Sequence, residues 1–395
     1  MARIVNSWNE WDPLRRVVLG TARGTQIPAP EPAWHYNNVN GGFPFGEYGP
    51  FPEEMVERAC EQQEGFSKAM QKRGVTVDRV VPHESMLRVQ AVSTPDWTQL
   101  NQRGISNPRD LFLVLGNEIV EATGSLRSRF YEYLALRPLF EKWFEEDPDF
   151  VWTAAPRPRL TDASYVKNYY YDYDNVWDDE KKAEMQRQGR YQLTEKEPLW
   201  DAADAARAGK DIFLQPSAVT NRKGFEWIRR YLSRLGFRVH KIEFDTSVSK
   251  FYRPWHIDCS ISLLKPGTAI TCPGKPPLTQ EAVELFKIND WEMIPAAEPI
   301  YHWTDKLTLC NTVKGQGQNG VNWISMNVLS LDPKTVCVDA NELDFCEQLN
   351  RLGFEVIPVQ YEAVFRFGGM LHCTTLDIYR EGSLEDYFPK QISGY

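Results

Sequence analysis

One cysteine and one histidine–aspartate pair stand out as residues that could do covalent chemistry. Cys373 follows a glycine pair in the segment 367–377, and glycine allows another group to approach the backbone closely. Taken alone, such a cysteine is better interpreted as buried and unreactive. His256 and Asp258 are two positions apart, so on a strand both side chains would face the same side. The pair fits two interpretations equally well. One is a general base beside a cation-binding carboxylate, and the other is a purely structural contact.

Further carboxylates stand at predicted element boundaries. Asp110 directly precedes the apolar run 111–115. Asp201 and Asp204 precede the segment 209–214, in which Asp211 stands directly before the apolar run 212–214. An acidic residue at the start of an element is normally a cap, and that interpretation is preferred for each residue taken singly. The residues alone do not choose among Asp201, Asp204 and Asp211 as a partner for a catalytic group.

The combination of these residue types suits one reaction. A thiolate attacks the central carbon of a guanidinium or amidinium group, and a histidine gives a proton to the departing amine. Paired carboxylates hold the planar cation through bidentate hydrogen bonds. A cysteine protease is a poorer interpretation, because carboxylates paired around the histidine would have no role there.

The elements that must position these residues repeat along the chain. A helix predicted over 53–72 is followed by Gly74 and a short strand over 75–77. The same pattern recurs around Gly236 and Gly353, and a weaker copy has Asn289 and Asp290 in place of glycine. One such unit is expected in any α/β protein, whereas four copies indicate a repeated α/β module with unequal insertions.

Short apolar runs predict the strands of these modules. They cover 14–20, 111–115, 212–214, 259–264, 268–271, 326–329 and 336–338. The stretch 21–52 is rich in glycine, proline and aromatic residues and is predicted to be irregular, as functional lids often are. No Pro/Gly/Ser-rich linker divides the chain, so we expect residues 1–395 to form a single domain.

Composition disfavours several classes of protein. The chain has 54 acidic and 45 basic residues, a formal charge of −9 that argues against a nucleic-acid partner. No apolar run approaches the ~20 residues of a membrane span, and the N-terminal residues lack an apolar signal core. Seven cysteines without a Cys-x-x-Cys motif argue against a disulfide scaffold or a structural zinc site. We therefore expect a cytoplasmic protein with no membrane partner and no metal.

The sequence resembles the arginine amidinotransferases of the pentein superfamily over almost its whole length. The matching segments are NSWNEWDP at 6–13, PRD at 108–110, GNEIVEA at 116–122, RSRFYEY at 127–133, DAAD at 201–204, HID at 256–258, WISMNVL at 323–329 and GGMLHC at 368–373. As a set these motifs are highly specific. Within the family the chain is most similar to the glycine amidinotransferases and to cyanobacterial toxin-pathway members.

This resemblance implies an α/β fold, a five-bladed pseudo-symmetric propeller of ββαβ modules around a central active site. Three catalytic residues are implied, namely the nucleophile Cys373, the acid/base His256 and Asp201, which orients that histidine. The substrate-binding residues that it implies are Asp110, Asp258, Lys275, Arg127 and Trp255.

The reaction implied by the resemblance is the transfer of the amidino group from L-arginine to an acceptor amine. Ornithine leaves first, a ping-pong order, and no cofactor is needed because the guanidinium already carries the charge. Small-molecule substrates are the expected partners, a homodimer the expected assembly and specialised-metabolite biosynthesis the expected setting. Two alternatives stay open: a guanidino-group hydrolase of the same superfamily, in which water replaces the amine, and a catalytically silent binding protein on this fold.

Two departures from the family pattern concern the donor's α-carboxylate. Lys275 stands where the family usually has an arginine, and a lysine supplies charge without the bidentate fork. Gly320 and Val321 stand where the family often has two serines, so no hydroxyl is offered there. Arginine remains the expected donor, and Trp255, directly before His256, is expected to reshape the acceptor pocket.

Overall fold

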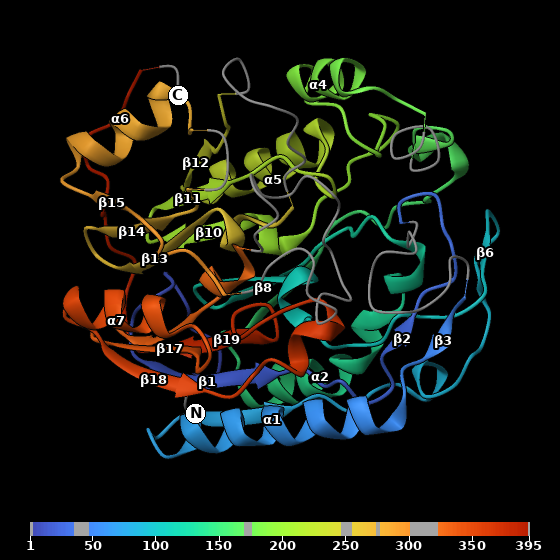
Figure 1. Cartoon of the computed structure of the whole chain (residues 1–395), viewed down its shortest axis with the longest axis horizontal. Coiled ribbons are helices and arrows are strands. Elements are labelled where there is room, and N and C mark those ends of the chain that lie inside the picture. The colour runs from blue at the N-terminus through green and yellow to red at the C-terminus, as the bar shows by residue number, and fades with distance from the viewer. Residues whose placement is uncertain are drawn as a thin grey trace.

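The computed structural model describes residues 3–34, 47–169, 176–245, 255–273, 277–300 and 323–393. Lys275, Gly320 and Val321 lie outside the described residues. Within these ranges the labelled strands are arranged around a common centre, and helices such as α1, α6 and α7 lie on the outside (Figure 1).

Five three-stranded sheets share one topology, which confirms the expected ββαβ propeller. In each sheet the first two strands are antiparallel and the third, which follows a helix, is parallel to the second. The strands are β19 (Thr375–Arg380), β1 (Leu14–Leu19) and β4 (Thr76–Arg79); β7 (Phe112–Leu115), β8 (Glu118–Glu121) and β9 (Val151–Ala154); β10 (Ala205–Ala208), β11 (Asp211–Leu214) and β12 (Arg238–Lys241); β13 (Ile261–Lys265), β14 (Thr268–Thr271) and β15 (Glu292–Pro295); β16 (Leu329–Asp332), β17 (Thr335–Asp339) and β18 (Glu355–Val359).

The helices and the short strands complete the modules and their insertions. One helix belongs to each sheet: α1 (Glu53–Gln71), α2 (Arg137–Glu146), α5 (Arg222–Arg234), α6 (Gln280–Ile288) and α7 (Leu343–Arg351). The insertions carry α4 (Asp179–Arg187) and two small hairpins, β2 (Gln26–Ile27) with β3 (Gly49–Pro50) and β5 (Val92–Ser93) with β6 (Thr98–Gln99). The last strand, β19, pairs with β1, so the two ends of the chain build one blade together.

Left-handed residues after the helices explain why the repeat is visible in the sequence. Gly74, Gly236 and Gly353 have φ angles of 79°, 91° and 85°, and Asp290 adopts the same region with φ 61°. The fifth unit was not predicted because α2 ends differently. Its C-cap, Asp147, is extended, and its carboxylate accepts the backbone N–H of Ile4.

A 3₁₀ turn precedes the first strand of every blade. The turns are η2 (Pro108–Asp110) before β7, η6 (Ala202–Asp204) before β10, η8 (Ile257–Cys259) before β13, η10 (Trp323–Met326) before β16 and η11 (Val364–Phe367) before β19. Neighbouring turns meet, since η6 contacts both η2 and η8, and η8 also contacts η10. The fold thus gathers the residues just before five different strands.

The predicted starts of two strands fall in these turns. The strand predicted over 259–264 begins only at Ile261, and His256 and Asp258 belong to the cap and the body of η8 rather than to a strand. The strand predicted over 326–329 is β16, which begins at Leu329, whereas Met326 ends η10. Short apolar runs do not distinguish a buried 3₁₀ turn from a strand. The other predicted strands are confirmed to within two residues at each end.

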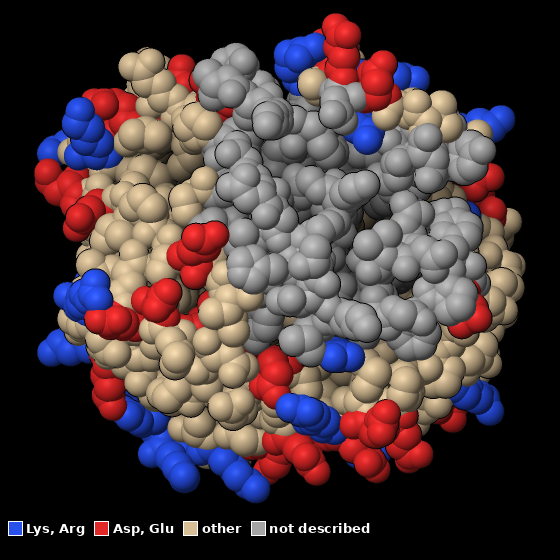
Figure 2. All heavy atoms as spheres, in the orientation of Figure 1, with Lys and Arg blue, Asp and Glu red and all other residues tan. Residues whose placement is uncertain are grey.

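Lysine, arginine, aspartate and glutamate side chains are interspersed around the described part of the face shown in Figure 2. Among the described residues, every helix is too short or too polar to cross a membrane.

Candidate active site

Cys373 lies in the turn between η11 and β19, at the centre of a polar cluster. Its side chain is buried, and its Sγ lies 3.0 Å from Asn327 Nδ2 and 3.3 Å from Asp258 Oδ2. Gly369 makes this close packing possible, because a Cβ there would lie only 2.6 Å from Cys373 Cβ. The glycine pair therefore serves close approach, as the sequence suggested.

His256 lies between two carboxylates that come from different blades. Its Nε2 is 3.3 Å from Asp201 Oδ2, and its Nδ1 is 3.6 Å from Asp110 Oδ1. Asp201 is the N-cap residue of η6, and Asp110 is the last residue of η2. One ligand-type atom each of Asp110, His256 and Cys373 lies within 4.8 Å of the others. The structure therefore brings together a thiol, an imidazole and a carboxylate far apart in sequence.

Asp258 provides a second carboxylate beside the thiol. Its Oδ2 accepts a hydrogen bond from His372 Nδ1 at 2.9 Å and faces Cys373 Sγ. Burial would raise the pKa of this carboxyl, but the hydrogen bond from His372 and the nearby imidazoles lower it to about 2. Asp258 is therefore ionised at neutral pH even though it is buried.

The charges of the site hold a proton on the histidine and on the thiol. Burial lowers the pKa of His256, but Asp110, Asp201 and Asp204 together raise it to about 10. Burial, Asp258 and Asp110 raise the pKa of the Cys373 thiol well above its ordinary value. In the empty site, therefore, the histidine is a proton donor and the cysteine is a neutral thiol.

The structure distinguishes the three acids among which the residues alone did not choose. Asp201 contacts His256, as the resemblance implied. Asp204 instead accepts hydrogen bonds from Ser217 and Thr220, and burial raises its pKa to about 8. Asp211 is a structural residue.

Asp211 contacts a guanidinium and an imidazole of its own blade. Its carboxylate binds Arg238 and His240 at 2.6 and 2.7 Å. Both partners lie on β12, beside the strand β11 that Asp211 begins.

Three residues of the site were missed by reasoning from single residues. Arg129 Nη1 lies 2.5 Å from Asp110 Oδ2 and holds that carboxylate in place. Asn327 and His372 contact the thiol and Asp258 respectively. All three stand inside the quoted family motifs, which was the signal that could have found them.

The remaining predicted substrate-binding residues are placed differently. Trp255 is half-buried, and its ring lies 5.7 Å from the Trp34 ring and edge-on to His256. The Arg127 guanidinium donates to Leu160 O and pairs with Asp162. Among the described residues, the partners of the Arg127 guanidinium are not members of the cluster around Cys373.

The cluster is better suited to an organic cation than to a metal ion. The imidazole and the thiol both carry protons at neutral pH, so a metal ion would have to displace a proton from each, whereas a guanidinium would not. Asp110 and Asp258 place two carboxylates near the thiol, an arrangement that fits a planar guanidinium. A nucleophile and a proton donor lie beside these carboxylates, with atoms of Cys373 and His256 within 4.8 Å of each other.

Comparisons with known proteins agree with this chemistry, although no family model matches the chain. Mitochondrial glycine amidinotransferase of Danio rerio is 36% identical over 383 residues, which cover 96% of this chain and 84% of that protein. L-arginine:L-lysine amidinotransferase of Pseudomonas savastanoi pv. phaseolicola is 32% identical over 390 residues, covering 97% and 96%.

Solved structures give the same result. SxtG, an amidinotransferase of the saxitoxin pathway from Microseira wollei, has a TM-score of 0.80 and 33% identity, covering 97% of this chain and 99% of its own. Inosamine-phosphate amidinotransferase StrB1 from Streptomyces griseus has a TM-score of 0.77 and 28% identity, covering 98% and 100%. DDAH from Pseudomonas aeruginosa, at 12% identity and a TM-score of 0.52, shares the fold alone. Full-length similarity above 30% to proteins of one activity shows that this chain belongs to the amidinotransferase family and is an enzyme that transfers amidino groups.

Proposed function

We propose that the enzyme takes the amidino group from L-arginine, carries it on Cys373 and passes it to an acceptor amine. The observation that carries this proposal is the grouping of Asp110, His256 and Cys373 within 4.8 Å, with Asp258 on the other side of the thiol. A cation-binding pair of carboxylates, a nucleophile and a proton donor are the groups that such a transfer needs.

The donor guanidinium would bind between Asp110 and Asp258. Its positive charge offsets the two carboxylates that keep the Cys373 pKa high, so binding makes the thiol easier to ionise. A neutral thiol in the empty site and a thiolate in the complex would protect the nucleophile until the donor arrives.

In the first half-reaction the Cys373 sulfur bonds to the guanidino carbon, and the bond from that carbon to the ornithine nitrogen breaks. His256 gives its proton to the departing nitrogen and takes up the one released by the thiol, so it ends unchanged. The products are an amidino-cysteine that keeps the positive charge and a free amine. In the second half-reaction an acceptor amine repeats these steps in reverse.

Arginine as the donor is supported by the similarity to L-arginine:L-lysine amidinotransferase. The pairing of β19 with β1 supports a single domain of residues 1–395, since the blade needs both ends of the chain. The saxitoxin-pathway relative supports a place in specialised-metabolite biosynthesis, and the acceptor is then a small amine.

The test is isotope exchange without an acceptor. Labelled ornithine mixed with enzyme and unlabelled arginine should yield labelled arginine, because a ping-pong enzyme runs its first half-reaction alone in both directions. Sustained ornithine release that needs no amine would identify a hydrolase instead. Absence of both exchange and release over a panel of amines would exclude arginine as the donor.

A further inference from the structure

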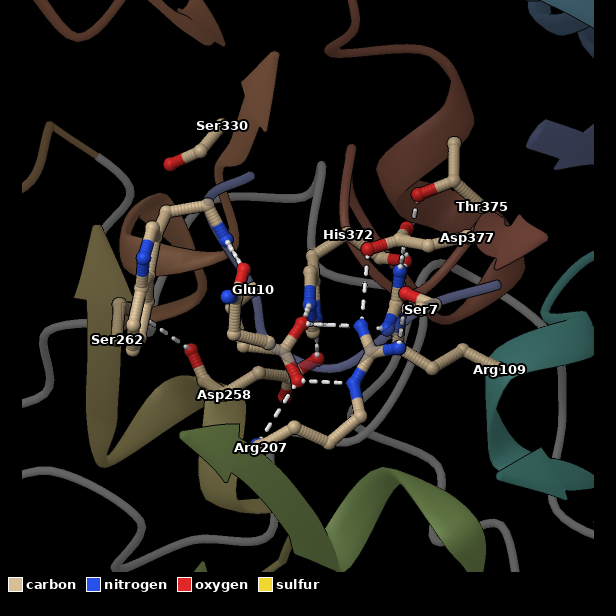
Figure 3. A network of polar contacts seen from close by, with 12 residues as sticks. Ser7, Glu10, Arg109, Arg207, Asp258, Ser262, Ser330, His372, Thr375 and Asp377 are labelled. Carbon is tan, nitrogen blue, oxygen red and sulfur yellow. Dashed lines mark hydrogen bonds and ion pairs between the residues drawn. The ribbon is translucent and has the colours of Figure 1, made fainter. Parts of the chain in front are cut away.

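His372, the residue directly before the thiol, is placed between two carboxylates. Its Nδ1 lies 2.9 Å from Asp258 Oδ2, and its Nε2 lies 3.4 Å from Glu10 Oε2 (Figure 3). Its backbone N–H donates to Asn327 Oδ1 at 3.0 Å. The ring is therefore fixed on both sides and at its own backbone.

The far carboxylate belongs to a buried cluster of ion pairs. Glu10 Oε1 accepts from Arg207 Nε, and Glu10 Oε2 from Arg207 Nη2, both at 2.7 Å. Asp377 binds the same Arg207 at 2.9 Å and Arg109 at 2.6 Å. These four side chains are at most 7% exposed. A cluster bonded in this way is a rigid anchor, because moving any member would leave a buried charge unpaired.

The two carboxylates determine the hydrogen-bonding role of the His372 ring. Their neighbours keep the pKa of Glu10 and of Asp258 below the ordinary range, so both are ionised and accept hydrogen bonds only. Each of them can therefore accept a hydrogen bond from a ring N–H of His372, Asp258 at the Nδ1 side and Glu10 at the Nε2 side.

We propose that His372 is a positioning residue, which holds the Asp258 carboxylate in the orientation that receives the donor guanidinium and ties it to the anchored Glu10. The inference rests on the proposed function, since Asp258 is there a guanidinium ligand. Without the Nδ1–H donor, the Cys373 thiol at 3.3 Å would be the one hydrogen-bond donor left to Asp258 Oδ2 among the described residues.

The test compares three substitutions that keep different parts of the imidazole. His372→Asn keeps an N–H close to the position of Nδ1, His372→Gln keeps one close to Nε2, and His372→Phe keeps only the ring shape. His83→Asn is the matched control, because His83 caps the surface turn η1 with its Nδ1 and asparagine caps equally well.

The kcat/KM of the arginine half-reaction should depend on whether the variant keeps an N–H at the position of Nδ1. His372→Asn should stay within about fivefold of wild type in kcat/KM, whereas Gln and Phe should lose roughly 10- to 150-fold, the value of one charge-assisted hydrogen bond. The loss should fall mainly on the KM for arginine, because Asp258 binds the donor. Equal losses in the Asn and Gln variants, or a Phe variant close to wild type, would overturn the proposal.

The pH profile gives a readout that a merely structural role would not move. The ionisable groups facing Asp258 are His372 and Cys373 from the turn before β19, and His256 and Cys259 from η8. Loss of the His372 donor should raise the Asp258 pKa, so the acid limb of kcat/KM should move to higher pH in the Gln and Phe variants only. An unmoved acid limb would count against the proposal.

A measurement without turnover separates this inference from the proposed function. Difference infrared titration of the Asp258 carboxyl, identified with Asp258→Asn, reports its protonation directly. The wild-type enzyme could be inactive with arginine while the Asp258 titration is still shifted in His372→Gln and not in His372→Asn. That result would contradict the proposed donor and support the positioning role. A titration unchanged in all variants would overturn that role whatever the activity.

Discussion

The side-chain amide of Asn327 makes two hydrogen bonds with Cys373. Its Oδ1 accepts the Cys373 backbone N–H at 2.9 Å, which leaves Nδ2 to donate to Sγ at 3.0 Å. Asn327 follows η10 and Cys373 precedes β19, so two neighbouring blades join at the nucleophile. A donor aimed at sulfur stabilises a thiolate more than a thiol, because hydrogen bonds to charged groups are the stronger ones.

We therefore predict that Asn327→Ala slows ornithine release roughly 10- to 100-fold in kcat, the value of one hydrogen bond to a charged group. Stopped-flow or quench measurement of the arginine half-reaction gives this rate. Asn350→Ala, at an exposed position near the end of α7, is the control and should keep wild-type kinetics. A kcat unchanged in Asn327→Ala would mean that the amide does not act on the thiolate.

The two carboxylates beside the thiol should affect transfer and thiol reactivity in opposite directions. Asp258→Asn and Asp110→Asn should each cut arginine turnover severely, because a donor replaces an acceptor that the guanidinium needs. The same variants should speed alkylation of Cys373 by iodoacetamide, because each carboxylate raises the thiol pKa.

Peptide mass spectrometry follows that alkylation with time at fixed pH. Asp290→Asn, at an almost fully exposed position, is the matched control and should change neither quantity. Slower alkylation in both active-site variants would contradict the electrostatic account of the resting thiol.

The pH dependence of His256 provides another prediction. Its pKa is raised from 6.5 to about 10, so its carboxylate partners stabilise the fold fully below pH 6.5, and that stabilisation is lost as the pH rises through 10. Asp201→Asn removes one of these partners and should move the alkaline limb of kcat/KM to lower pH. If the pH profiles of kcat/KM for wild type and Asp201→Asn have the same alkaline limb, Asp201 does not set the protonation of His256.

Lys275 lies outside the described residues, and its role in binding the donor's α-carboxylate stays a prediction from the sequence. Lys275→Ala should weaken arginine binding by ~1.5–3 kcal/mol, roughly 10- to 150-fold in KM, the range for a charged hydrogen bond. The half-reaction kcat should fall less, because the carboxylate is remote from the reacting carbon. Lys287→Ala, on the exposed side of α6, is the control. Unchanged arginine kinetics would show that the donor carboxylate is bound elsewhere.

The local sequence pattern predicted four of the five repeated modules. Gly74, Gly236 and Gly353 mark helix ends because a left-handed residue favours glycine, a preference visible in any window of sequence. The α2 blade escaped notice because Asp147 ends its helix through a bond to the distant N-terminal segment. Features that depend on long-range contacts leave no local signature.

In the site too, the residue types were visible in the sequence, whereas the contacts between distant residues were not. Residue types predicted the chemistry, yet Asp201 and His256 are 55 positions apart, and only the family resemblance selected this acid over its neighbours. His256 and Asp258 would share one face on a strand, but in the structure the turn η8 and its N-cap present them. The Glu10–Arg207 anchor spans 197 positions, and only Glu10 stands inside a quoted family motif, at 6–13.

The covalent step depends on a single sulfur, so the matched cysteine variants are informative. Cys373→Ser should abolish transfer with the fold intact, because a serine hydroxyl is far less ionised at neutral pH than a thiol. Cys60→Ser, in the half-buried part of α1, should keep full activity. Turnover above a few per cent in Cys373→Ser would contradict covalent catalysis.

The most direct measurement is the mass of the peptide that carries Cys373 after the enzyme is mixed with arginine alone and quenched in acid. The account predicts an added amidino group on Cys373, matched by about one equivalent of ornithine per active site, which then disappears when an accepted amine is added. Ornithine formed with Cys373 unmodified at every time point would contradict a covalent amidino-cysteine.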